Sequence, residues 1–338
     1  MKAIQLKAYG NAETAFELVE MKKPKIEPQD VLIKVSSFGL NYADVMARMG
    51  IYNDAPPLPA VLGYECVGII EEIGSEVRDL KVGDRVMAST RFGAYAEFVK
   101  TNQVGALKIP DQISDGEACA LTVQYATGWF SAFQAINIEP GEHVLVHAAA
   151  GGVGTALVQL CKSKGCVVYG TASSEEKLTY LNDLGVDYPI NYSKKDFAKE
   201  VMKIRGKKRL DVIFDPVGGK SFKKGMKILA FGGRMVIYGA SSREEKGLWK
   251  LLKLVFGFGF HTPIANIMKS QSWVGVNMLR IGDTKPELIR KSMLACLKFY
   301  NDGIAKPHIG GIFKANEIAS AHALLASRKS IGKIVVEW

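Results

Sequence analysis

The 338-residue sequence has few of the side chains that bind metals or form disulfides, with only five cysteines and five histidines. No two cysteines form a CxxC pair, and none stands beside a histidine at the spacing of metal ligands. An odd number of scattered cysteines is typical of reduced thiols, so we expect no disulfide framework and a cytoplasmic location. The five are Cys66, Cys119, Cys161, Cys166 and Cys296.

Long apolar runs are also missing, so the sequence predicts no membrane-spanning helix. The densest apolar stretch, Leu251 to Phe260, is interrupted by Lys253 and by two glycines. The first residues, Met1 to Lys7, alternate like a strand and lack the apolar centre of a signal peptide. A composition of 48% hydrophobic and 23% charged residues excludes a disordered chain.

Acidic residues are the scarcer charged type, 34 against 44 basic ones, which gives a formal net charge of +10. This balance favours anionic ligands, although many enzymes have a mildly basic surface without any anionic partner. The sequence has no RNA-binding motif, and a basic run such as Arg205 to Arg209 is more typical of a solvated surface. We therefore expect no nucleic-acid partner.

Length and local pattern indicate two domains. The first 110 or so residues contain short β-branched and aromatic runs separated by glycine and proline, which predicts a barrel-like or sandwich domain. Its expected strands are 2–7, 16–21, 31–38, 66–73 and 95–100. The proline-rich segment 53–63 is expected to be irregular, because proline cannot donate a ladder hydrogen bond.

After about residue 114 the pattern becomes α/β. A helix is predicted over 114–135, and strands and helices then alternate as in a doubly wound parallel sheet. The expected strands are 143–147, 166–171, 187–190, 210–215 and 234–238, and the expected helices are 152–164, 174–184, 196–204 and 220–229. Ser173 and Glu176 have the spacing of a capping box for the second of these helices.

The last 60 or so residues predict helices over 285–300 and 316–327 and a final strand over 333–337. We assign this tail to the first domain. The predicted domains are therefore 1–122 together with 273–338, and an inserted dinucleotide-binding domain over 123–272.

The strongest local signal is a glycine-rich turn between an expected strand and an expected helix. On the GxGxxG template of dinucleotide-binding folds, the key positions are Ala149, Gly151 and Gly154. Gly151 lets a pyrophosphate approach the backbone, and Gly154 lets the helix pack closely on the strand. The free N–H groups at the helix start attract phosphate. The predicted phosphate-binding residues are Ala150, Gly151, Gly152, Val153 and Gly154.

The end of the next strand favours NADPH over NADH. An NAD-type site places an acidic residue there to bind the ribose 2′-hydroxyl, but this strand ends in polar, neutral residues. Hydroxyl groups and a lysine suit a 2′-phosphate, which a carboxylate would repel. The predicted residues of this part of the site are Gly170, Thr171, Ser173, Lys177 and Tyr192.

Four stretches spread over the whole chain resemble the zinc-independent medium-chain dehydrogenases/reductases of the quinone oxidoreductase type. They are Gly39–Tyr52, Val82–Val86, Pro140–Gly154 and Gly332–Val336. Pro57-Leu-Pro and the segment after Ser241 look most like the branch of the synaptic-vesicle membrane protein homologues. The resemblance implies a doubly wound Rossmann domain, a β-rich GroES-like barrel domain, and a homodimer formed through an edge strand of the Rossmann sheet.

The zinc-dependent relatives bind their catalytic metal through an early cysteine and a Gly-His-Glu motif. In this sequence the motif is Gly63-Tyr64-Glu65, and the stretch Gly39-Leu-Asn41 stands where the cysteine would be. Because catalytic zinc needs about three protein ligands, we expect no metal. Without a Lewis acid, hydride transfer needs an acceptor that disperses its own charge, which favours quinones and activated enones over simple alcohols.

The resemblance also places residues at the active site. Asn41, Asp44 and Tyr52 would face the nicotinamide, with Asn41 binding substrate or cofactor and Tyr52 donating a hydrogen bond or a proton to the developing oxyanion. The alternative interpretation of Asp44 is a helical salt bridge with Arg48, four residues further on. Further cofactor contacts are implied for Thr127, Val217, Tyr238, Gly239, Asn277, Arg328 and Lys333.

The segment 241–272 is the least certain in function. Arg243, Lys246, Lys250 and Lys253 would lie on one face of a helix, with apolar residues filling the rest. Such a segment is typical either of a helix that packs on its own protein or of one that touches an anionic membrane surface, here through residues 243–256. A lid or a subunit contact is a third interpretation.

The leading hypothesis is an NADPH-dependent, zinc-free oxidoreductase that reduces quinones or activated enones. An alternative is an enoyl-thioester (acyl-CoA) reductase, because enoyl reductase modules carry a similar glycine motif. A second alternative, from a different class, is a cofactor-binding adaptor at a membrane surface without strong catalysis.

Overall fold

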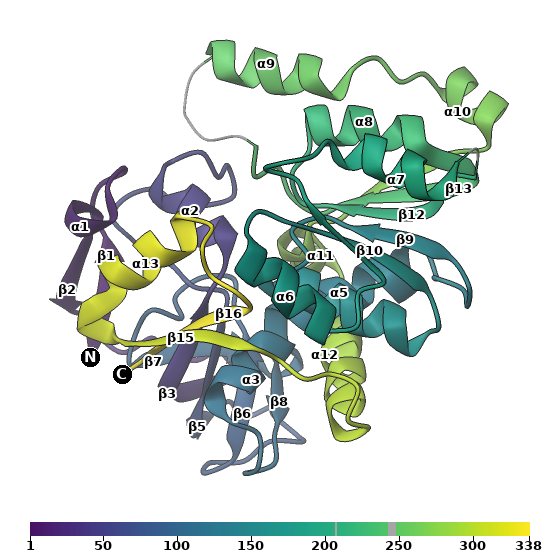
Figure 1. Cartoon of the computed structure of the whole chain (residues 1–338). Helices are drawn as coiled ribbons and strands as arrows, with labels where there is room; N and C mark the ends of the chain where they lie inside the picture. The colour runs from purple at the N-terminus through teal and green to yellow at the C-terminus, as the bar shows by residue number, and fades with distance from the viewer. Residues whose placement is uncertain (207, 243–247) are drawn as a thin grey trace. The chain divides into compact units, whose positions relative to one another are not determined.

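The computed structural model describes residues 1–206, 208–242 and 248–338 (Figure 1). The chain divides into two compact units. Unit 1 comprises residues 1–126, 278–301 and 306–338, and unit 2 comprises residues 127–277 and 302–305. The sequence placed the two boundaries at 122 and 272, whereas this division places them at 126 and 277.

Unit 1 is the GroES-like, β-rich unit. In the described residues its larger sheet has the order β15-β16-β3-β5-β6-β8, with β7 also paired to β3, and a smaller sheet has the order β2-β1-β4. The strands of the larger sheet are β3 (Asp30–Leu40), β5 (Glu65–Ile73), β6 (Arg85–Ser89), β7 (Phe98–Asn102), β8 (Ala106–Lys108), β15 (Ile309–Lys314) and β16 (Lys333–Glu337). Those of the smaller sheet are β1 (Lys2–Leu6), β2 (Phe16–Glu20) and β4 (Ala60–Val61).

The central strand β3 organises this unit. Val31, Ile33 and Val35 are buried in the core of the unit. On the other face of the strand Leu32 is also buried, whereas Lys34 is exposed. One face of β3 therefore covers the core, and the other face is only partly exposed. Phe38 continues the buried face and stacks on Tyr95, with ring centroids 4.5 Å apart. Because β16 pairs antiparallel with the end of β3, the first residues of β16 lie beside the start of the helix that follows β3.

Helices cover the ends of the unit 1 sheets. They are α1 (Ala12–Ala15), α2 (Tyr42–Arg48), α3 (Asp115–Ala120), α11 (Met278–Thr284), α12 (Pro286–Asn301) and α13 (Ile318–Ala326). The helix predicted over 114–135 continues from α3 through wider π-type turns on either side of α4 (Ala126–Trp129). One expectation was wrong: segment 53–63 is not wholly irregular, because β4 follows the last proline of that segment and pairs with β1.

Unit 2 is a doubly wound α/β unit. Its described strands form one parallel sheet with the order β11-β10-β9-β12-β13-β14. This is the 3-2-1-4-5-6 order of dinucleotide-binding folds, with the reversal between β9 and β12. The strands are β9 (His143–Val146), β10 (Val167–Ala172), β11 (Tyr188–Asn191), β12 (Leu210–Asp215), β13 (Leu229–Ile237) and β14 (Ser272–Gly275).

Helices lie on both faces of this sheet. Figure 1 shows α7 and α8 over one face and α5 and α6 over the other. Both faces of the sheet are therefore buried, which explains the short, continuous apolar strands such as β9. The helices of unit 2 are α5 (Gly152–Ser163), α6 (Glu175–Asp183), α7 (Phe197–Arg205), α8 (Lys220–Ile228), α9 (Leu248–Phe258) and α10 (Pro263–Lys269).

The predicted cap of α6 was wrong by one residue. Ser174 rather than Ser173 is the N-cap, and its hydroxyl accepts a hydrogen bond from the backbone N–H of Lys177. In the described ranges no helix is long and apolar enough to cross a bilayer. Within the segment 243–256, for which membrane contact was one interpretation, residues 243–247 and the side chains of Lys250 and Lys253 lie outside the described residues.

Candidate functional site

A buried polar network links the start of α2 to strands β5 and β16 in unit 1. The Lys333 ammonium forms an ion pair with Glu65, and both side chains are completely buried. Lys333 also donates to Asn41 Oδ1 at 3.2 Å, and Asn41 Nδ2 donates to Glu65 Oε2 at 2.7 Å. The Asn41 amide therefore keeps one N–H for a ligand, since its other N–H and its carbonyl oxygen are already used.

Lys333 is consequently a positioning residue in this structure. Its Nζ also donates to the carbonyl of Leu40, so all three ammonium hydrogens have acceptors inside unit 1. The sequence interpretation of Lys333 as a direct cofactor contact does not fit this arrangement. The side chain instead fixes Asn41 and neutralises Glu65, which would otherwise be a buried carboxylate without a counter-charge.

Asp44, in the first turn of α2, is completely buried. Its Oδ2 accepts from the backbone N–H of Asn41 at 2.8 Å, while Oδ1 has no hydrogen-bond partner among the described residues. Burial is the main cause that raises the pKa of Asp44 to about 8, and the nearby Glu65 adds to the effect. Asp44 therefore holds a proton at neutral pH.

The alternative salt bridge between Asp44 and Arg48 does not form. Arg48 lies on the same helix but donates to the backbone carbonyl of Gly10. Burial, rather than a carboxylate, dominates its environment and lowers its pKa. The Asp44 carboxyl thus remains available to other groups.

Tyrosines face the same region of unit 1. Tyr52 and Tyr64 lie edge to face, with ring centroids 6.4 Å apart, and Phe92 packs on Tyr64 at 5.1 Å. Burial is the largest cause that raises the pKa of both tyrosines, and Asp44 and Asp54 act in the same direction. The buried Tyr64 hydroxyl has no hydrogen-bond partner in the described part of the chain. An oriented but unsatisfied hydroxyl suits a ligand oxygen.

The residues that stand where the zinc-dependent relatives have their zinc ligands do not fit a zinc ion. Tyr64 stands where the zinc-dependent relatives have histidine, and Glu65 is already bound to Lys333 and Asn41. Within the described ranges no group of three or more His, Cys, Asp or Glu side chains could hold a metal ion. At this position Glu65 instead forms an ion pair with Lys333 and accepts a hydrogen bond from Asn41, so its charge is already compensated.

The glycine-rich turn of unit 2 lies between β9 and α5. Gly151 is the N-cap of α5. Ala148, three residues earlier in the turn, has a positive φ of 52°. A Cβ on Gly154 would lie 2.2 Å from the carbonyl oxygen of Ala148, so only glycine fits there. The N–H groups of Gly152, Val153 and Gly154 begin the helix and have no intrahelical acceptor. This arrangement fits a pyrophosphate.

A buried histidine supports this turn, and the sequence analysis did not assign it a role. Thr171 Oγ1 accepts from the backbone N–H of Ala148 at 3.3 Å and lies 3.1 Å from His147 Nδ1. The Thr171 hydroxyl thus links the imidazole of His147 to the backbone of the turn. Burial lowers the pKa of His147, so the ring is neutral. Thr171 is thus a support of the turn rather than an exposed ligand.

The residues predicted for a 2′-phosphate come together at the ends of β10 and β11. The Tyr192 backbone N–H donates to Ala172 O at 3.0 Å, and the Ser193 hydroxyl donates to Ser173 O at 3.1 Å. Lys177 lies in the first turn of α6 beside them and is largely buried, which lowers its pKa. Gly170 lies within β10, packed against the core side of the sheet.

One acidic residue close to this group, Glu175, is compensated. Glu175 accepts from Lys194 Nζ at 2.8 Å and from Asn191 Nδ2 at 3.1 Å. The bond from Lys194 is the main cause that lowers the pKa of Glu175. A phosphate near Tyr192 would therefore meet a carboxylate whose charge is already paired.

The remaining predicted site residues belong partly to unit 2 and partly to unit 1. Val217, Tyr238 and Gly239 follow the ends of β12 and β13, where Asp215 Oδ1 accepts from the Val217 N–H at 2.7 Å. Thr127 and Asn277 are the first and last residues of the main segment of unit 2. Arg328 belongs to unit 1 and donates to the Tyr42 hydroxyl at 3.4 Å, beside the start of α2.

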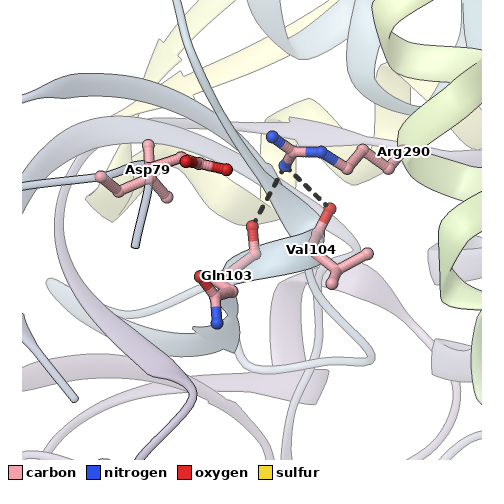
Figure 2. Close-up of a pocket in the computed structure, with 5 residues that line it drawn as sticks. Asp79, Gln103, Val104 and Arg290 are labelled. Carbon is pink, nitrogen blue, oxygen red and sulfur yellow. Dashed lines mark hydrogen bonds between the residues drawn. The ribbon is translucent and has the colours of Figure 1, made fainter. Parts of the chain in front are cut away.

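A small cavity of about 110 Å³ lies elsewhere in unit 1. Figure 2 shows Arg290 donating to the backbone carbonyls of Gln103 and Val104 at its wall, with Asp79 opposite. It shares no lining residue with the predicted site, so we assign it no part in the reaction.

Comparison with known proteins agrees with this architecture. Residues 27–111 match the alcohol dehydrogenase GroES-like domain, and residues 152–292 match the family described as zinc-binding dehydrogenase. The synaptic vesicle membrane protein VAT-1 homolog of Danio rerio is 36% identical over 99% of this chain and 69% of its own length.

Two solved structures extend the comparison. The Escherichia coli quinone oxidoreductase complexed with NADPH has a TM-score of 0.88 and 26% identity, covering 100% of both chains. The CurK enoyl reductase has a TM-score of 0.85 and 27% identity, covering 99% of this chain and 98% of its own.

The fold and the two groups of site residues define an oxidoreductase of the quinone oxidoreductase/enoyl reductase type, with a domain for an NAD(P)-type cofactor. The chain belongs to the medium-chain dehydrogenase/reductase family, in the branch of the VAT-1 homologues.

Proposed function

We propose that this protein is an NADPH-dependent, zinc-independent reductase of quinones or activated enones. The observation that carries the proposal is the replacement of the metal ligands by the Asn41–Glu65–Lys333 network, beside a protonated Asp44. This set provides hydrogen bonds and a proton to a ligand oxygen but has no cationic metal to stabilise an alkoxide. It therefore favours acceptors that delocalise negative charge themselves.

Unit 2 would hold NADPH, which supplies the hydride. The N–H groups of Gly152 to Gly154 would bind the pyrophosphate, and Lys177 with Ser173 and Tyr192 would bind the 2′-phosphate. Val217, Tyr238 and Gly239, at the carboxyl ends of β12 and β13, would line the groove of the dinucleotide. Thr127 and Asn277 would lie towards the nicotinamide, and Arg328 would contribute a cation from unit 1.

Unit 1 would hold the acceptor. The free N–H of Asn41 and the hydroxyl of Tyr52 would bind the acceptor oxygen, which gains negative charge as hydride is transferred. Asp44, whose pKa burial raises to about 8, would supply the proton that completes the reduction, and Tyr52 would relay it to that oxygen. The overall change is addition of one hydride and one proton. Protonation of oxygen gives a hydroquinone from a quinone, and from an enone it gives an enol that tautomerises to the saturated ketone.

An enoyl-thioester is the second candidate substrate class, favoured by the likeness to CurK enoyl reductase. The chemistry is closely similar, because an α,β-unsaturated thioester also forms a delocalised enolate when hydride is added. The two candidates differ in the acceptor and not in the residues that we assign.

The deciding experiment is a titration of the purified protein with NADPH and NADH, followed by NADPH oxidation with four acceptors. These are an ortho-quinone, a para-quinone, an enone and crotonyl-CoA. We expect tight NADPH binding, weak NADH binding and turnover of a quinone or the enone. Preferential turnover of crotonyl-CoA would establish the second candidate, and NADPH binding without any turnover would contradict both.

We also propose a homodimer formed through β14. This strand is the last in the order of the described sheet, and its Trp273 side chain is 46% exposed. An edge strand with an exposed aromatic side chain can pair with its copy across a twofold axis. The Val276 N–H donates to Ile237 O on β13, so the N–H of Trp273, three residues earlier, points to the free edge of β14. Sedimentation velocity of the wild-type protein and of Trp273→Pro, which removes this edge donor, tests the assembly.

A further inference from the structure

Two cysteines of unit 2 lie at the turn that joins the end of α5 to the start of β10. Cys161 is in the last turn of the helix, and Cys166 directly precedes the strand. No two other cysteines of the chain are as close in sequence. Both are free thiols, and the proposed reductase reaction uses neither of them.

The turn is a Schellman motif, which commonly ends a helix. The Cys166 N–H donates to the Cys161 carbonyl at 3.0 Å, and the Gly165 N–H donates to the Lys162 carbonyl at 3.0 Å. Gly165 has a φ of 79°, the left-handed conformation that this motif needs. The two residues that the longer of these backbone bonds joins frequently have their side chains in contact. The backbone therefore brings Cys161 and Cys166 side by side.

The two thiols interact directly. The hydrogen bond between them is the main cause that raises the pKa of the Cys161 thiol and lowers that of the Cys166 thiol. Lys162 and Lys164 also lower the pKa of Cys166, against the opposing effects of burial and of Glu142. Cys166 is thus the more readily ionised of the two, and the thiolate is the reactive form of a cysteine.

The pair lies directly beneath a surface turn. Cys161 and Cys166 are themselves buried, but Ser163 and Gly165, between them in the chain, are exposed. On its other side the Cys166 thiol donates to the backbone carbonyl of Glu139 at 3.4 Å. Helix ends fray and open more easily than the centre of a fold, so a small oxidant can reach this pair.

The other three cysteines are in a different situation. Cys66, Cys119 and Cys296 belong to β5, α3 and α12 of unit 1 and are completely buried. Burial is the main cause that raises the pKa of each of these thiols. They therefore stay protonated and unreactive, and they serve as internal controls for the pair in unit 2.

We propose that Cys161 and Cys166 are a site of reversible oxidation, at which a hydroperoxide converts the two thiols into an intramolecular disulfide. The Cys166 thiolate would attack a peroxide oxygen, so that the O–O bond breaks and a sulfenic acid forms. The Cys161 sulfur would then attack the sulfenic sulfur, forming the S–S bond and releasing water. With hydrogen peroxide, two thiol hydrogens and two electrons are transferred, and the products are one disulfide and two water molecules.

The backbone is already arranged for this bridge. A disulfide joins residues whose Cα atoms are about 4.4–6.8 Å apart. The hydrogen bond from the Cys166 N–H to the Cys161 carbonyl keeps the two Cα atoms close enough for such a bond. The disulfide is therefore expected to form without displacing α5, and a thiol reductant is expected to reverse it.

The test is peptide mapping of the full-length protein after exposure to a small molar excess of hydrogen peroxide. The remaining thiols are alkylated before digestion with trypsin and a glutamate-specific protease, which leaves Cys161 in residues 143–162 and Cys166 in residues 165–175. We expect these two peptides to be linked, two hydrogens lighter than their sum, and to separate after reduction with dithiothreitol. Alkylated Cys161 and Cys166 in the oxidised sample would overturn the proposal, as would a link to any other cysteine.

Two single variants separate the roles of the two thiols. Cys161→Ser removes the second thiol, so the sulfenic acid of Cys166 should persist and be trapped by dimedone. Cys166→Ser should lose its remaining thiols to peroxide at least about tenfold more slowly than the wild type, because those thiols are buried and protonated. Equal rates in Cys166→Ser and the wild type would contradict the assignment of Cys166 as the attacking group.

The matched control is Cys296→Ser, which removes another buried thiol. It is expected to form the linked peptides as the wild type does. Electrophoresis without reductant should show the oxidised protein as a single chain, and a disulfide between two chains would overturn the proposal. These measurements follow thiols and linked peptides, not NADPH oxidation, so failure of this site is distinguishable from failure of the proposed function.

Discussion

The two groups of candidate site residues, one in each unit, are built in opposite ways. In unit 2 the binding element is backbone: a turn of small residues followed by the N–H groups at the start of α5, which have no intrahelical acceptor. In unit 1 it is side chain: a buried ion pair, an amide and a protonated carboxyl that come from strands β5 and β16 and helix α2. The first group is specified by a few neighbouring residues, and the second only by the completed fold.

This difference has an energetic consequence. The glycine turn costs little to maintain, because its requirements are steric and local. The unit 1 network places charges where water cannot reach, and its stability depends on every partner being present. Substitutions should therefore affect mainly ligand binding in unit 2, but both stability and function in unit 1.

The largest expected effect comes from breaking the ion pair. Lys333→Met leaves Glu65 buried without its counter-charge and should lower the free energy of unfolding by about 3–5 kcal/mol. Chemical denaturation measures this directly. The double variant Lys333→Met with Glu65→Leu should recover most of the loss, because no unpaired charge remains. A loss in the double variant as large as in the single one would show that the pair itself, and not the uncompensated charge, is responsible.

The second prediction addresses the group in unit 2. Gly154→Val would place a side chain within 2.2 Å of the Ala148 carbonyl oxygen, so the turn must distort. NADPH binding should weaken by on the order of a hundredfold or more, since several phosphate contacts depend on the turn. Gly275→Ala is the control, because a Cβ there meets no atom within 4 Å. Fluorescence titration with NADPH measures both variants, and normal binding by Gly154→Val would remove the turn from the site.

The third prediction concerns the contribution of Asp44 to the pH dependence of the free energy of unfolding. A carboxyl whose pKa is about 8 in the folded protein and near 3.8 when unfolded binds more protons in the folded state between these values. Its contribution to stability is therefore present at low pH and is lost as pH rises from about 4 to about 8. The slope is at most about 1.4 kcal/mol per pH unit for one group.

Asp44→Asn should flatten this part of the stability profile without a large loss at low pH, because the amide imitates the protonated acid. The same variant should lower kcat for NADPH-dependent reduction and remove its decrease above pH 8, whereas NADPH affinity should not change. A stability profile identical to that of the wild type would mean that Asp44 is ionised in the folded protein.

The glycine turn of unit 2 could be predicted from the sequence, whereas the buried network of unit 1 could not. The turn from Ala149 to Gly154 could be located because strand, glycines and helix are contiguous in the chain. The pairing of Glu65 with Lys333 joins residues 268 positions apart and carries no local pattern, so Lys333 was assigned to the cofactor. The spacing of Asp44 and Arg48 suggested a helical salt bridge. In the fold, Asp44 instead accepts from the N–H of Asn41, and Arg48 donates to the carbonyl of Gly10.

The same reason explains the smaller errors. Ser173 has the capping-box spacing to Glu176, but α6 begins at Glu175, so the adjacent Ser174 is its N-cap. His147 gave no signal, because a histidine within an apolar strand is more often a core residue than a support for a ligand turn. Its role depends on Thr171, which lies on the neighbouring strand β10.

The smallest expected effect concerns cofactor choice. Lys177→Ala should weaken NADPH binding about tenfold, the loss of one charge-assisted hydrogen bond to phosphate, and leave NADH binding nearly unchanged. Lys199→Ala, which removes an exposed lysine from α7, is the control for net charge. Because the charge of Glu175 is already paired with Lys194, this carboxylate does not select NADH, and the preference should fall without reversing. Equal weakening of NADPH and NADH would show instead that Lys177 supports α6, and the choice between the cofactors would then depend on Ser173 and Tyr192.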